Sequence, residues 1–150
     1  MKIERAVIQD APEILALQKL AYRSEAEIHN DFSIQPLTQT LDDLKAEFQS
    51  HDVFKVMHGK DLVGSVRTLV EGDTCYVGKL TVHPAHQNQG IGYTLMSYIE
   101  SHTAMVRRFE LFTGHLSVKN LYLYEKLGYR EYKREKINDR LTLIFLEKQV

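Results

Sequence analysis

The segment from Leu80 to Gly92 constrains this chain most, because it has the pattern of a strand, a loop and a helix N-terminus in succession. A β-branched run ends at Val82, a His-Pro loop follows, and two glycines stand two positions apart. Apolar residues then recur at helical spacing: Ile91, Leu95, Tyr98 and Ile99. We therefore predict that a strand leads through a tight loop into a helix at this point.

A junction of this kind favours the binding of an anion. The first N–H groups of a helix have no intrahelical partner, and the aligned peptide dipoles place about +0.5 charge there. Gly90 and Gly92 lack a Cβ, so a phosphate can approach the main chain closely. Each amide bonded to a charged oxygen is worth about 1.5–3 kcal/mol. The sequence therefore predicts phosphate binding without a basic cluster.

The spacing of the glycines excludes the two common nucleotide-binding motifs. A Walker loop would need a second glycine five positions after Gly90, followed by a lysine, but this chain has Leu95 at that position. The lone Gly59-Lys60 pair is followed by Asp61, and the third glycine of a dinucleotide fingerprint is again replaced by Leu95. A nucleotide-binding module is therefore not predicted.

The remaining pattern is Gln87-x-x-Gly90-x-Gly92. It resembles the Gln/Arg-x-x-Gly-x-Gly/Ala signature of the GCN5-related N-acetyltransferases (GNAT), whose loop holds the pyrophosphate of acetyl-coenzyme A. A second run, at 120–129, resembles the second signature of the same family. In this run Asn120 is followed four residues later by Tyr124 and then by Leu127-Gly128-Tyr129. The two signatures occur in the right order, and the resemblance extends over nearly the whole chain.

The resemblance implies an α/β (α+β) fold over a single domain, residues 1–150. We expect a mixed, mostly antiparallel central sheet of about seven strands flanked by about four helices, with strands four and five parallel and splayed apart. The residues agree with this fold, because three strand-like runs joined by short turns form an antiparallel meander, and a helical crossover then favours a parallel neighbour. The expected strands are 2–8, 53–58, 62–70, 74–82, 108–113, 129–136 and 140–146.

The expected helices differ in how clearly the sequence marks them. The first begins after Asp10 and carries an inward stripe of Ile14, Leu17, Leu20 and Ala21. From 22 to 39 the periodicity breaks down, which predicts an irregular connection; the resemblance implies that this region lines the acceptor site. Three further helices are expected near 41–48, 90–105 and 117–127, the last with Ser117 as its cap.

Composition narrows the setting in which the chain works. Its 150 residues carry 19 basic and 20 acidic side chains, so the strongly basic footprint of a nucleic-acid binder is missing. No apolar run reaches membrane-spanning length and the N-terminus lacks the apolar core of a signal peptide, so we expect no membrane partner and a cytoplasmic location. Cys75 is alone, and no ligand cluster predicts a metal.

The resemblance also implies roles for individual residues. Leu80, Thr81 and Val82 correspond to the strand whose main chain orients the pantetheine arm and the thioester, and Asn120 to the asparagine that contacts the arm. Tyr124 corresponds to the tyrosine that acts as general acid on the leaving thiolate. The pyrophosphate loop corresponds to seven residues: Gln87, Asn88, Gln89, Gly90, Ile91, Gly92 and Tyr93.

The general base is not marked in the same way. Several members of the resembled family carry a glutamate on the fourth strand, where this chain has 76–79, Tyr-Val-Gly-Lys, with no carboxylate. Glu110, the acidic cluster of Glu25, Glu27 and Asp31, and a chain of water molecules all stay open as the proton acceptor. Lys79 is interpreted as a strand-edge or surface charge.

These observations predict an N-acetyltransferase that transfers an acetyl group from acetyl-CoA directly to a primary amine, with no metal. The alternative is an acyl-CoA-binding sensor or interaction module of the same fold that catalyses nothing. We expect a small-molecule amine as acceptor, with a protein amine as the alternative, and a monomer or a homodimer. The acidic cluster would suit a cationic amine such as a polyamine, an aminoglycoside or a lysine side chain.

Overall fold

Two tight turns build the first half of the sheet. In this computed structural model, which describes residues 1–150 throughout, β2 (Asp52–His58), β3 (Asp61–Glu71) and β4 (Thr74–Val82) form the expected antiparallel meander. Gly59 and Gly72 occupy the two turns with φ of +63° and +59°, a conformation that glycine adopts at little cost. The predicted bounds of these three strands are correct to within one residue.

The N-terminal region is more helical than its sequence pattern indicates. Strand β1 (Lys2–Arg5) is shorter than the expected 2–8, because a 3₁₀ turn at Ile8–Asp10 replaces its end. Helix α1 (Ala11–His29) continues eight residues past the point where the apolar stripe stops, and α2 (Gln35–Thr38) occupies part of the predicted irregular segment. The prediction of a connection without structure from 22 to 39 is thus wrong for most of its length.

Helix α3 (Leu41–Glu47) precedes β2. Thr40 caps this helix, since its Oγ1 accepts a hydrogen bond from the N–H of Asp43, and a short loop then leads from the helix into β2.

The second half of the chain completes the sheet around one crossover helix. The remaining elements are a second 3₁₀ turn and five regular elements: Pro84–His86, α4 (Ile91–His102), β5 (Arg108–Gly114), α5 (Val118–Lys126), β6 (Arg130–Lys136) and β7 (Thr142–Gln149).

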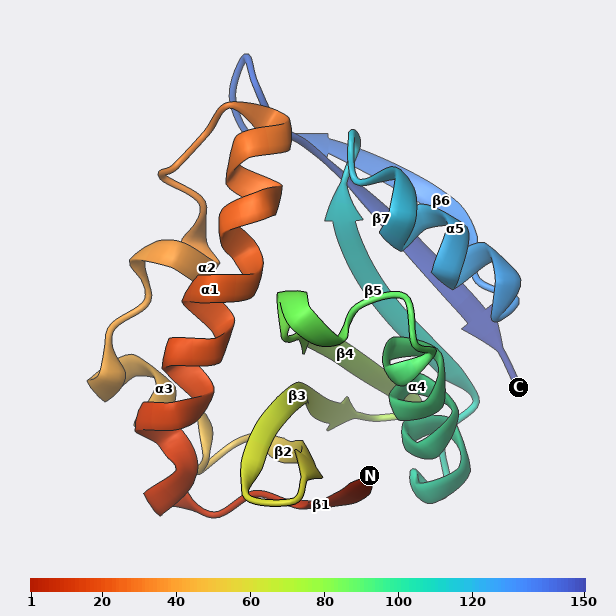
Figure 1. The fold of residues 1–150 in the computed structure, drawn as a ribbon. Coiled ribbons are helices and arrows are strands. Elements are labelled where there is room, and N and C mark those ends of the chain that lie inside the picture. Colours follow the sequence, from red (N-terminus) through yellow and green to blue (C-terminus); the bar gives the residue numbers. More distant parts are fainter.

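The seven strands lie in the order β1-β2-β3-β4-β5-β7-β6, and only β4 and β5 are parallel (Figure 1). These two strands pair over three positions, from Thr74 opposite Arg108 to Tyr76 opposite Glu110, and then separate. Residues 77–82 of β4 therefore have no partner on the β5 side. The predicted mixed sheet with splayed central strands is confirmed, with five α-helices rather than about four.

Helices cover both faces of the sheet. Helices α1 and α3 pack with a small buried cluster that includes Ile14, Leu44 and Val53, while α4 and α5 pack with a larger cluster of 16 buried residues (Figure 1). The predicted stripe of α1 is correct except at Leu20, whose side chain is 45% exposed. None of the helices combines the length and the apolar character that a bilayer span requires.

A bulge deforms β4 just where it leaves β5. The register between β3 and β4 shifts between Ser65 and Arg67, which pair with Thr81 and Gly78. The extra residues opposite Val66 include Lys79, which has a φ of +53°. A left-handed backbone costs a non-glycine residue about 1–2 kcal/mol, so the surrounding structure holds this bulge against local strain.

Candidate active site

Two cavities meet where β4 and β5 separate. The first, of about 470 Å³, runs along the loop before α4 and the start of α5. The second, of about 660 Å³, lies between α1, the residues after it, and strands β3, β4, β5 and β7. Both volumes are in the range of small-molecule sites. Four residues line both cavities: Tyr22, Glu25, Leu80 and Asn120.

The first cavity contains the predicted anion site. From Gln87 to Tyr93 no main-chain N–H group donates to a main-chain carbonyl, and the first bond of α4 runs from Thr94 to Gly90 at 3.0 Å. Gly90 has a φ of +79°, and a Cβ on Gly92 would lie 3.3 Å from Leu123 Cδ2. Consecutive unpartnered amides at a helix start fit a pyrophosphate group.

Nearly all the residues predicted for the donor come together in this cavity. Gln89 is the exception, since it does not line the cavity wall. The side chain of Gln87 turns back and donates to the carbonyl of Val82 at 3.3 Å, which ties the loop to the end of β4. The predicted residues that line it are Leu80, Thr81, Val82, Gln87, Asn88, Gly90, Ile91, Gly92, Tyr93 and Asn120.

Asn120 and Ser117 fix the wall between the two cavities. The side-chain amide of Asn120 donates to Thr113 Oγ1 at 3.2 Å and to Glu25 Oε1 at 3.4 Å. Ser117 occupies the predicted cap position of α5, but its hydroxyl makes no capping bond and instead donates to the other oxygen of Glu25. The prediction that Ser117 caps the helix through its side chain is therefore wrong.

Tyr124 faces the second cavity from α5. Its side chain is only 5% exposed, and its ring packs edge-on against Tyr129. Burial, and then the nearby Tyr22 and Glu25, raise the pKa of Tyr124 well above its usual range. The phenol is therefore neutral at physiological pH and holds a proton at the wall of the second cavity.

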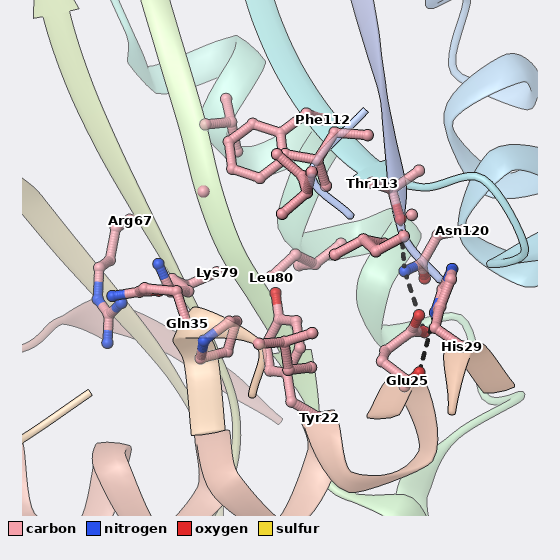
Figure 2. Close-up of a pocket in the computed structure, with 18 of the residues that line it drawn as sticks. Tyr22, Glu25, His29, Gln35, Arg67, Lys79, Leu80, Phe112, Thr113 and Asn120 are labelled. Carbon is pink, nitrogen blue, oxygen red and sulfur yellow. Dashed lines mark hydrogen bonds between the residues drawn. The ribbon is translucent and has the colours of Figure 1, made fainter. Parts of the chain in front are cut away.

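Tyr22 is a second phenol at the same place, and the sequence did not single it out. It extends from α1 toward Leu80 (Figure 2) and lines both cavities. Burial raises the pKa of Tyr22 above its usual range, Glu25 raises it further, and Arg67 opposes the shift. Tyr22 thus lies between a carboxylate and a guanidinium.

Of the carboxylates left open as the base, Glu25 is the one at the junction. Glu110 accepts hydrogen bonds from Arg108 and from Tyr132, each at 2.6 Å, and lines neither cavity. Glu27 is exposed and also lies outside both cavities. Asp31 lines the second cavity, but hydrogen bonds from Ser33 and Asn138 lower its pKa.

The second cavity also has a positively charged end. Arg67 on β3 is 2% exposed and donates through Nη2 to Gln18 Oε1 at 2.5 Å. Lys79, at the bulge, lines the same cavity beside Arg67 (Figure 2). It lies on the unpaired edge of β4, as one of the two interpretations had it, but it faces a cavity and not the outer surface. Burial, and then the Arg67 guanidinium, lower the pKa of Lys79.

The splayed sheet and the unpartnered amides at the start of α4 are the features in which this fold agrees with that of known acetyltransferases. The chain belongs to the Acetyltransferase (GNAT) domain family, which matches residues 49–131. Among solved structures, an acetyltransferase from Thermus thermophilus superposes with a TM-score of 0.77 at 18% identity, covering 100% of this chain and 98% of that one. YncA from Salmonella typhimurium, solved with its cofactor acetyl-CoA, gives 0.77 at 19% identity over 99% and 93% of the chains.

A curated protein relative is similar over part of its length. The UPF0157 protein YqkA of Bacillus subtilis (strain 168) is 27% identical over 133 residues, which cover 89% of this chain. The chain spans only 38% of that relative's length.

Proposed function

We propose that this protein transfers an acetyl group from acetyl-CoA to a primary amine of a small molecule. The observation that carries the proposal is the meeting of two cavities at one carboxylate: Glu25 closes the donor cavity on one side and the acceptor cavity on the other. The size of the second cavity, about 660 Å³, supports a small-molecule acceptor over a protein surface.

The main chain does most of the work of holding the donor. The N–H groups of 87–93 would bind the pyrophosphate, and the strand residues Leu80 to Val82 would orient the pantetheine arm and the thioester carbonyl. The Oδ1 atom of Asn120 would accept from an amide of the arm, because both bonds of its side chain within the protein are made through Nδ2. Acetyl-CoA, when bound, supplies the activated acetyl thioester.

Glu25 would accept the proton of the acceptor amine. An amine is mostly protonated at neutral pH and attacks only when its lone pair is free. Loss of one proton to Glu25 frees that pair, the new C–N bond forms, and the C–S bond breaks with its electrons on sulfur. The second proton that the nitrogen loses replaces the proton that Tyr124 gives to sulfur, and Glu25 releases its own proton to solvent. A positioned general base of this kind contributes about 10²–10⁴-fold to the rate.

Tyr124 would return a proton to the leaving sulfur. Burial raises the pKa of this phenol, which makes it a weaker acid than in water. The same dry surroundings also make a thiolate a stronger base, because burial disfavours both anions. The difference between the two pKa values, which governs the transfer, therefore changes less than either value alone. Tyr22 lines both cavities, so its contribution to protonation of the sulfur can be compared with that of Tyr124 by mutation.

The first test is a thermal-melt titration with acetyl-CoA, with ATP and NAD as controls. Donor at one hundred times its dissociation constant stabilises the fold by about 2.7 kcal/mol, a rise of several degrees for a domain of this size. Release of free coenzyme A is then followed with a thiol reagent over a panel of amines. Binding without release over the whole panel would favour the non-catalytic sensor, and no binding of acetyl-CoA would overturn the proposal.

A further inference from the structure

The end of the acceptor cavity that lies away from Glu25 has an excess of positive charge. Arg67 and Lys79 lie side by side there, while Glu25, His29 and Asn120 lie at the other end (Figure 2). Such a separation of charge along one cavity is unusual for a site that accepts a simple cation. It indicates that the ligand itself carries two kinds of charged group.

The guanidinium of Arg67 is incompletely satisfied by the protein. Its Nη2 donates to Gln18, and its Nη1 lies 3.4 Å from Glu47 Oε2, but Nε and Nη1 make no hydrogen bond. Glu47 also accepts a hydrogen bond from Gln39 at 2.7 Å, and its side chain is partly exposed to solvent. A buried cation with a single, partly exposed carboxylate nearby leaves a positive field in the cavity.

Lys79 adds a second cation that has no partner in the protein. No carboxylate oxygen lies within 4.0 Å of its ammonium group, and the residue sits in a left-handed backbone conformation at the bulge. Like charges in a partly buried site repel each other, and here the bulge directs Lys79 toward Arg67 rather than away from it (Figure 2). An anion between the two would remove both costs.

We propose that the acceptor is an amine that also carries a carboxylate several bonds away from it, the chemistry of an amino acid that reacts through a side-chain amine. Its amine lies at Glu25, beside the thioester, and its carboxylate lies at Lys79, with Arg67 behind it. Arg67, Lys79 and Glu47 together leave one net positive charge, which a monoanionic carboxylate neutralises and a dianionic phosphate exceeds. This inference rests on the proposed function and replaces the expectation of a purely cationic amine.

The acceptor test uses matched compounds that differ only in the anion. The purified protein and saturating acetyl-CoA are assayed for coenzyme A release with L-lysine, L-ornithine and a series of ω-amino acids of increasing length, their carboxamides and their decarboxylated amines. Phosphoethanolamine serves as the phosphate-bearing arm. For the best side chain we expect kcat/KM for the amino acid to exceed that of the carboxamide and of the amine by about 10- to 100-fold, the range for a hydrogen bond between charged groups.

Variants of Lys79 connect that preference to the site. Lys79→Gln should raise the KM for the amino acid about tenfold or more and leave the KM for its decarboxylated amine unchanged. The rise in melting temperature caused by acetyl-CoA should also stay the same. Lys79→Arg should retain the preference because it retains the charge. The matched control is Lys60→Gln, an exposed lysine in the turn between β2 and β3.

The outcomes separate this inference from the proposed function. Equal or better use of amines without a carboxylate, or a preference unchanged in Lys79→Gln, would overturn the inference while the transferase stands. A preference for phosphoethanolamine would assign the anion as phosphate and overturn the carboxylate. If no compound is acetylated, binding of the N-acetyl amino acids in the presence of coenzyme A is measured by calorimetry. Absence of that binding overturns the inference, and the acetyl-CoA melt then decides the function separately.

Discussion

Ser117, the residue before α5, donates its hydroxyl hydrogen bond to Glu25, which lies 92 positions earlier in the chain on α1. The bond joins the first helix to the start of α5. Asn120 holds the other oxygen of the same carboxylate. Glu25 is therefore fixed in one orientation at the point where the two cavities meet, which suits a group that must receive a proton from a bound amine.

Replacing Glu25 with Gln keeps the shape of the side chain and removes the base. We expect kcat/KM for the acceptor to fall by about 10²–10⁴-fold, with the dissociation constant of acetyl-CoA changed little. Glu27→Gln, on the exposed side of the same helix, is the control and should keep wild-type activity. Full activity of Glu25→Gln would move the base to a water chain.

The roles of the two phenols, Tyr22 and Tyr124, are distinguished by removing one hydroxyl at a time. Tyr124→Phe should lower turnover by at least tenfold and leave acetyl-CoA affinity nearly intact, because the proton donor is lost but the packing is kept. Tyr22→Phe should have the smaller effect. If their order is reversed in pre-steady-state measurements of thiol release, Tyr22 is the acid and Tyr124 only lines the cavity.

Glycine substitutions separate the anion site from backbone strain. Gly90 and Gly72 both have positive φ, and a methyl group added at either would meet no atom within 4 Å. An alanine at either position should therefore cost only the strain of the left-handed backbone, about 1 kcal/mol, or about 2–4 °C in Tm. Gly90→Glu should in addition abolish acetyl-CoA binding, because its carboxylate meets the pyrophosphate. Gly72→Glu, in the distant turn between β3 and β4, should bind the donor as wild type does.

The buried thiol of Cys75 should make stability depend on alkaline pH. Burial raises the pKa of this thiol from 9.0 to about 11. Between those values the unfolded chain has lost a proton that the folded chain keeps, so the free energy of unfolding falls as the pH rises, by up to about 1.4 kcal/mol per pH unit. Urea titrations from pH 7 to 11 should show this slope as a difference between wild type and Cys75→Ala.

If the free energies of unfolding of wild type and Cys75→Ala differed by the same amount from pH 7 to 11, the thiol would titrate equally in the folded and unfolded states, and the prediction would be wrong. Above about pH 10 a further loss of stability is expected in both proteins, because burial raises the pKa of three tyrosines and the unfolded chain ionises first. The tyrosines are Tyr22, Tyr124 and Tyr129.

The donor half of the site could be predicted from the sequence because it depends on the main chain. A helix start that must expose its amides needs glycine at Gly90 and Gly92, and these leave a spacing that is visible in one sequence. The sheet was predictable for a similar reason, since alternating strands and glycine turns are local patterns. The turn at Gly72 and the strands on either side of it lie within one residue of their predicted bounds.

The acceptor half could not be predicted because its side chains come from elements distant in the sequence. Tyr22 and Glu25 lie on the polar extension of α1, where the apolar stripe that marks a helix has ended because the helix borders a cavity instead of the core. Arg67 lies in the middle of β3, between Val66 and Thr68, and its neighbours in the sequence do not mark it as a site residue. Lys79 turns inward only because of a bulge, and the one sign of that bulge in the sequence is Gly78 inside the strand.

The separation of β4 and β5 also has a mechanical consequence. Three residue pairs at Thr74–Tyr76 join a four-stranded piece of sheet to a three-stranded piece, whereas seven pairs join β5 to β7 within the latter. Beyond those pairs the two pieces are held together by the buried cluster under α4 and α5 and not by main-chain hydrogen bonds. A molecule that fills the gap would bridge the two pieces there, and slower amide exchange would then spread through both of them.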